Sequence, residues 1–216
     1  MTIVDVLERN SLKFTNNEAI SEISYLNGKV KKSLSWKEFN SQSNQIANYL
    51  YENGIKKGDK IAIVMQNCIE WLPVFFGVLK VGAIAVPINH YMIKEDIEYC
   101  LNLVQCKGVI FTDNIRKKIE CILKNSKLSI CISVGNYNST FSIRYNTIIN
   151  TISTEYKKSK TDDEDYATIH FSSGTTGVPK AILHKHYSFI YSGIIEAFHR
   201  NAWPHSRQFS LAHACP

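Results

Sequence analysis

Short apolar segments alternate with amphipathic, helix-like segments through residues 1–134 of the 216-residue chain. The apolar segments are rich in Val and Ile and are bounded by Gly, Pro or polar residues, which favours buried strands. Strands that alternate with helices are joined by right-handed crossovers into a parallel sheet that is buried on both sides. We therefore predict an α/β fold, a mainly parallel sheet with helices on both faces. The expected strands are residues 60–65, 83–86, 108–112 and 128–134, and the expected helices between them are residues 68–81, 94–104 and 114–123.

Local turn and cap signals support this division. Asn27-Gly28 lies between two short strand-like segments and predicts a hairpin with a two-residue turn. Ser35-x-x-Glu38 is a capping box that begins a helix, and Asn53-Gly54 supplies a left-handed end to it. Asn67 is expected to cap the next helix, and Gly82 is expected to end it.

The pattern weakens after residue 134. Residues 135–165 are polar, charged and without a regular period, so we expect an irregular surface linker there. A strand is expected at residues 166–171 and a helix from about Ser188, whereas residues 204–216 follow no clear period. The expected division is a first α/β part (1–134), the linker (135–165), a strand with its loop and following helix (166–203), and an atypical tail (204–216).

The loop after residue 171 reads Ser-Ser-Gly-Thr-Thr-Gly-Val-Pro-Lys and combines hydroxyls, glycines and one ammonium group. Glycine tolerates positive φ and lets backbone N–H groups approach an anion closely, while hydroxyl and ammonium groups add donors and charge. The loop follows a strand, and open α/β sheets bind ligands at the carboxyl ends of their strands. The candidate phosphate-binding residues are Ser172, Ser173, Gly174, Thr175, Thr176, Gly177 and Lys180.

Two other interpretations fit part of this loop. A flexible surface connection could have a similar composition, but it would not need the strand context, the spaced glycines and the final Pro-Lys together. A P-loop requires four residues between its glycines and then Gly-Lys-Ser/Thr. Only two residues separate Gly174 from Gly177, and Ala181 follows Lys180, so the sequence does not favour a P-loop NTPase.

With this loop, the chain resembles the AMP-forming adenylate-forming superfamily, which includes acyl-CoA synthetases, luciferases and the adenylation domains of peptide synthetases. Four further segments carry the resemblance in the family's order: residues 35–39, 45–50 and 54–63, and the stretch Phe-Phe-Gly-Val-Leu-Lys-Val-Gly-Ala-Ile-Ala-Val-Pro-Ile-Asn at 75–89. Together the matching segments span about residues 1–200. The chain is thus similar to a partial N-terminal, AMP-binding domain of that family.

The resemblance implies a function and its cofactors. It implies a ligase that activates a carboxylic acid with ATP and Mg²⁺ and then forms a thioester with coenzyme A. Lys180 is the implied catalytic residue, acting on the phosphates, and no residues are assigned to a metal. Asn89 stands where peptide-synthetase domains more typically have Asp, which favours the acyl-CoA synthetase branch. The identity of the acid does not follow from these residues.

The chain also departs from the family pattern. Ala181 follows Lys180 where the family usually has Gly, and family enzymes are more than twice as long as this chain. The resemblance places the adenine-contacting aromatic, the ribose-binding Asp and the C-terminal catalytic Lys beyond Pro216. The chain alone is therefore expected to be catalytically incomplete, and the alternative is a noncatalytic remnant or a vestigial nucleotide-binding module.

Composition excludes other classes. The net charge of +6 comes from lysines spread along the chain, so no nucleic-acid surface is expected. The six cysteines show no Cys-x-x-Cys pair, and the histidines show no metal-ligand spacing. No long apolar run or signal-peptide pattern is present, so we expect a cytoplasmic protein without an integral membrane segment. His184 and His186 lie close to the loop in sequence, which leaves open a role near the nucleotide or a helix-entry role bonded to backbone.

Overall fold

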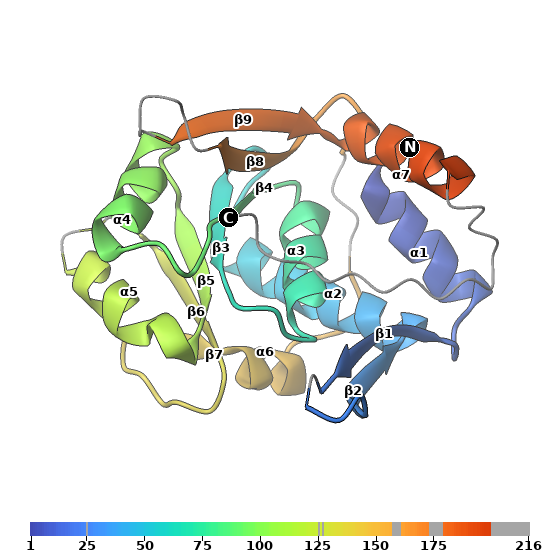
Figure 1. The fold of residues 1–216 in the computed structure, drawn as a ribbon, viewed down its shortest axis with the longest axis horizontal. Helices are drawn as coiled ribbons and strands as arrows, with labels where there is room; N and C mark the ends of the chain where they lie inside the picture. Colours follow the sequence, from blue (N-terminus) through green and yellow to red (C-terminus); the bar gives the residue numbers. More distant parts are fainter. Residues whose placement is uncertain (25, 125, 127, 157–160, 173–178, 200–216) are drawn as a thin grey trace.

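The computed structural model describes residues 1–24, 26–124, 126, 128–156, 161–172 and 179–199. Figure 1 shows the resulting α/β arrangement, with the central strands between two groups of helices. The helices are α1 (Ile3–Lys13), α2 (Trp36–Glu52), α3 (Trp71–Lys80), α4 (Lys94–Leu103), α5 (Arg116–Leu123), α6 (Tyr145–Thr151), α7 (His186–His199) and the 3₁₀ turn η1 (Asp113–Ile115). The strands are β1 (Glu18–Ile23), β2 (Val30–Ser35), β3 (Lys60–Val64), β4 (Ile84–Pro87), β5 (Gly108–Thr112), β6 (Ile130–Val134), β7 (Ile143–Arg144), β8 (Tyr166–Ser172) and β9 (Lys180–Lys185).

The main sheet has the strand order β7-β6-β5-β3-β4-β8-β9. All neighbouring strands in it are parallel except β8 and β9, which are antiparallel. One face packs against α1, α2, α3 and α6, and the other face packs against α4 and α5. Alternate residues of one strand face opposite sides, so Ile61 and Ile63 belong to the first core and Ala62 and Val64 to the second. The predicted α/β class, with a mainly parallel sheet covered on both faces, is confirmed.

The cap signals act as the sequence predicted. The Ser35 hydroxyl accepts from the Glu38 amide at 3.2 Å, and the Glu38 carboxylate accepts from the Ser35 amide at 2.8 Å. These reciprocal bonds satisfy donors at the start of α2 that have no partner within the helix. Gly54 and Gly82 follow the ends of α2 and α3 with φ of +83° and +82°, a conformation that glycine adopts without strain.

Helix α3 begins at Trp71, later than the start at residue 68 that was expected from a cap at Asn67. Its N-cap is Glu70, which makes no capping bond through its side chain, and Trp71 is the first helical residue. Pro73 explains the shift, because proline has no amide hydrogen and is tolerated only in the first turn of a helix. A start at residue 68 would place Pro73 where an amide donor is required.

Two other segments differ from the expectations. Strands β1 and β2 do pair antiparallel, but residues 24–29 connect them instead of a two-residue turn. The Ser24 amide donates to the Lys29 carbonyl at 2.8 Å, and Gly28 has φ of +67°. The stretch 135–165, expected to be irregular, contains β7 and the short helix α6.

Amide side chains of α2 hold the segment that follows α6. Each side-chain N–H₂ group donates to backbone carbonyls of α6 or of the residues after it at 2.6–2.9 Å. The donors are Asn44, Gln45 and Asn48, and the acceptors are the carbonyl oxygens of Ile149, Ile152, Ser153, Thr154 and Glu155. Tyr145 adds a bond from its hydroxyl to Gln42 at 2.8 Å. Helix α2 thus positions much of the 145–155 segment.

No helix among the described residues is long and apolar enough to cross a membrane. The five described cysteines are free thiols. Burial raises the pKa of the Cys68 and Cys106 thiols to about 12, so these groups stay protonated at neutral pH.

Helices α2 and α3 pack closely at Gly77, which generates a stability prediction. A Cβ at this position would lie 2.6 Å from Cβ of Ile46 and 3.0 Å from the Ser43 carbonyl oxygen. Gly77→Ala is therefore expected to lower the free energy of unfolding by about 1–3 kcal/mol through overpacking. Gly193→Ala is the matched control, because no atom lies within 4 Å of its Cβ position in α7. Urea denaturation compares the two variants, and equal stability would contradict the close packing.

Helix α7 generates a second prediction, on association. Phe189 and Ile190 pack against the first core, but the exposed fractions of Ile194, Ile195 and Phe198 are 52%, 55% and 81%. An apolar patch of this kind promotes association. We expect concentration-dependent association in light scattering, reduced by the double change Ile194→Gln and Ile195→Gln. Leu12→Gln removes an exposed apolar side chain from α1 and is expected to leave association unchanged; a monomer at all concentrations would refute the prediction.

Candidate functional site

The β8–β9 hairpin frames the candidate phosphate loop. Ser172, the last residue of β8, pairs across the hairpin with Lys180, the first residue of β9. Paired residues of antiparallel strands project on the same side of a sheet, so the Ser172 hydroxyl and the Lys180 ammonium belong to one face. Ser172 is half-buried and Lys180 is exposed. Ser173, Gly174, Thr175, Thr176 and Gly177 lie outside the described residues.

The segment after the loop differs from the sequence expectation. The helix expected from about Ser188 is present as α7, which begins at His186, but strand β9 at residues 180–185 was not expected. Lys180 therefore lies on an edge strand bonded to β8 and not in a connection that leads directly into a helix. The backbone ladder of the hairpin holds both ends of the loop.

The loop opens at the carboxyl edge of the parallel sheet. Strand β8 runs parallel to β4, with Thr168 paired to Ala85, and both residues are fully buried. Parallel strands end at the same edge, so the end of β8 lies on the same edge as the ends of β3, β4, β5 and β6. This is the edge at which open α/β sheets bind ligands.

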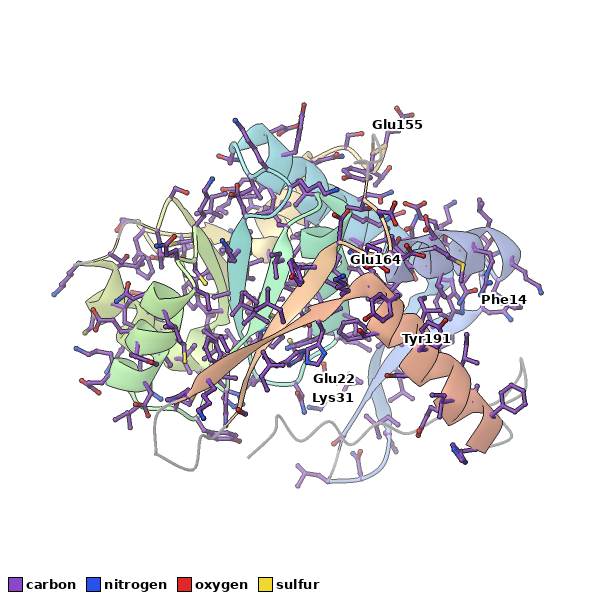
Figure 2. The ribbon with its side chains drawn as sticks, turned by 90° about the horizontal axis from the view of Figure 1, so that it is seen from above. Phe14, Glu22, Lys31, Glu155, Glu164 and Tyr191 are labelled. Carbon is purple, nitrogen blue, oxygen red and sulfur yellow. The ribbon has the colours of Figure 1, made fainter. Side chains whose placement is uncertain are left out.

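Ionic contacts anchor the opposite end of the hairpin. Lys185, the last residue of β9, bonds Glu164 at 2.6 Å, and Lys57 bonds Asp165 at 2.5 Å. The hydrogen bond to Glu164 raises the pKa of Lys185. Figure 2 labels Glu164 near the junction of the hairpin and α7. Because these contacts involve residues just before β8 and the last residue of β9, they hold the base of the hairpin and leave its other end to the loop.

His186 lies at the helix entry, one of the two positions that the sequence left open for it. It is the first residue of α7, its side chain is buried, and its amide donates to the Asp165 carbonyl at 3.1 Å. Burial lowers the pKa of its imidazole, an effect that outweighs the opposing charge of Asp165. His186 is at the far end of β9 from Lys180, so the structure does not bring it to the loop.

His186 generates a prediction on pH. A folded-state pKa below the usual 6.5 means that the unfolded chain binds this proton more readily. The stability from this group is therefore present above about pH 6.5 and is lost as pH falls. We expect His186→Gln to show a smaller decrease in Tm between about pH 7.5 and pH 5 than the parent chain. His199→Gln, at the exposed end of α7, is the control, and an equal decrease in both variants would contradict the assignment.

The described part of the site carries a hydrogen-bond donor and a positive charge. A hydroxyl donor and an ammonium group stand at the two ends of a loop with further hydroxyls and two glycines. Within the described ranges, no group of three or more His, Cys, Asp or Glu side chains is arranged to hold a metal ion.

The sequence of the chain is similar to those of known proteins. The profile of the AMP-binding enzyme family matches residues 7–215. The crotonobetaine/carnitine–CoA ligase of Proteus mirabilis (strain HI4320) is 32% identical over 176 residues, which cover 77% of this chain and 33% of that enzyme. The corresponding ligase of Shigella flexneri is 31% identical over 79% of this chain and 34% of that enzyme.

Solved structures show the same fold. The anthranilate CoA ligase AuaEII, solved with anthranoyl-AMP, superposes with a TM-score of 0.82 at 27% identity over 90% of this chain and 36% of that chain. An acyl-CoA synthetase of Brucella canis shares the fold with a TM-score of 0.79 at 19% identity, covering 91% of this chain and 35% of that chain. The chain thus spans about a third of the length of these relatives.

Proposed function

Because this chain belongs to the AMP-binding enzyme family, we propose that the protein activates a carboxylic acid with ATP and transfers the acyl group to coenzyme A. In the first step, a carboxylate oxygen attacks the α-phosphorus of ATP and the bond to pyrophosphate breaks. In the second step, the thiol of coenzyme A attacks the acyl carbonyl and AMP leaves. The names of the relatives, which are CoA ligases for different acids, support this reaction class and leave the acid open.

The observation that carries the proposal is the pairing of Ser172 with Lys180 at the ends of the loop. Negative charge grows on pyrophosphate as it departs, so donors held in place around its oxygens stabilise the transition state. Ser172, Ser173, Gly174, Thr175, Thr176, Gly177 and Lys180 would form this cradle. The hairpin ladder fixes the two end residues before the reaction begins, which limits the reorganisation required.

ATP would bring Mg²⁺ to the site as a phosphate-bound ion. Mg²⁺ usually keeps several waters and binds substrate phosphates with few protein ligands, which fits a site built from hydroxyls. The ion would offset charge on the departing phosphates. Lys180 would act there as a point charge and not as a proton donor.

The first test is acid-dependent exchange of pyrophosphate into ATP, measured over a panel of carboxylic acids. Since the chain spans a third of its relatives, the assay compares the chain alone with a version extended to their full length. Exchange in the extended version that depends on the acid supports the proposal. Absence of exchange with every acid, in a folded extended protein, favours the alternative of a noncatalytic nucleotide-binding module.

Lys180 generates the prediction specific to the loop. Lys180→Ala is expected to lower kcat of adenylation in the extended protein. The decrease corresponds to a loss of about 2–4 kcal/mol of transition-state stabilisation. KM for the acid is expected to change little, because this charge acts on the phosphates. Lys185→Ala is the matched control, since it removes the same charge from the other end of the same strand. Equal kinetics in the two variants would show that Lys180 has no special role.

A further inference from the structure

Two histidines face each other across the β8–β9 hairpin. Thr168 pairs directly with His184, and His170 lies two residues further along β8. Residues two apart in a strand share a face, so His170 and His184 are diagonal neighbours on one side of the sheet. His170 and His184 are too far apart in the sequence to match a short metal-binding motif. The register of the hairpin brings them together.

The spacing of the two rings suits a shared metal ion. Their centroids are 5.4 Å apart and their planes are inclined at 75°. A zinc ion lies about 2.1 Å from each ligating nitrogen, hence roughly 3.2 Å from the ring centre. Two rings at a tetrahedral angle would then have centres about 5.2 Å apart, close to the observed separation.

The surroundings leave the pair accessible and favour the neutral form of His170. His170 is exposed and His184 is half-buried, with the Phe189 ring 6.3 Å from His184. Partial desolvation, with a smaller contribution from the charge of His184, lowers the pKa of His170. A metal ion binds the neutral imidazole, so protons compete less strongly with the metal at neutral pH.

We propose that His170 and His184 form a two-histidine binding site for a borderline divalent metal of the zinc type. Imidazole suits Zn²⁺, Ni²⁺ and Cu²⁺, whereas Mg²⁺ prefers oxygen ligands. No third His, Cys, Asp or Glu completes the site among the described ranges, so water fills the other positions and the metal exchanges readily. The site is distinct from phosphate binding and does not depend on the proposed ligase activity.

A bound metal would link the two strands that frame the loop. His170 is two residues from Ser172 on β8, and His184 lies on the strand that begins with Lys180. A ligand that binds the folded hairpin and not the unfolded chain stabilises the folded state by mass action. Zinc would therefore raise Tm and hold the strands that carry both ends of the loop.

The test titrates ZnCl₂ into the full chain by calorimetry and follows Tm in parallel. All proteins carry Cys121→Ser, because that exposed thiol could bind zinc on its own. We expect His170→Gln and His184→Gln each to weaken zinc binding at least tenfold and to abolish the rise in Tm. His199→Gln, which removes an exposed histidine outside the hairpin, is expected to bind zinc as the parent does. MgCl₂ is expected to give no rise in Tm that depends on these histidines.

Zinc affinity that stays unchanged in both His170→Gln and His184→Gln would overturn the proposal, as would an equal loss in His199→Gln. Circular dichroism at each step establishes that a variant is folded. If His184→Gln does not fold, His170→Gln decides the question alone, because the His170 side chain is exposed. Full zinc affinity in folded His170→Gln would also overturn the proposal.

Discussion

Strand β8 joins the parallel sheet along β4, and the position of the candidate loop depends on this contact. Thr168 of β8 pairs with Ala85 of β4, and the neighbouring residues Ala167 and Ile169 are buried. Because the pairing is parallel, the end of β8 is carried to the ligand-binding edge of the sheet. An antiparallel pairing there would have turned the loop to the opposite edge.

Local signals predicted the elements whose stability is local. The capping box at Ser35 and the left-handed glycines at 54 and 82 depend on residues close in sequence, and they mark the ends of helices as expected. The buried strands β3 and β5 were recognised because apolar residues on both faces make a continuous Val/Ile-rich run. In these segments, propensity, burial and turn chemistry favour the same structure.

Helix α6 was missed because distant residues stabilise it. Its sequence, Tyr-Asn-Thr-Ile-Ile-Asn-Thr, is short and contains β-branched residues and Asn, which are weak helix formers. Gln45 of α2 donates to the carbonyls of Ile149 and Ile152 at 2.6 and 2.8 Å and so satisfies acceptors at the end of the helix. No pattern within residues 135–165 contains that information, because the donor lies about a hundred residues earlier in the chain.

The candidate site also depends on contacts between residues that are distant in sequence. Its composition, with spaced glycines, hydroxyls and a lysine after a strand, predicts phosphate binding, and this stays a prediction. Strand β9 was not predicted, since it is an edge strand whose side chains show no clean alternation of buried and exposed positions. Without β9, neither the Ser172–Lys180 pair nor the contact of His170 with His184 could be derived. The register of a hairpin places residues that are far apart in sequence side by side on one face. A search for metal ligands by sequence spacing therefore misses ligands that lie on different strands.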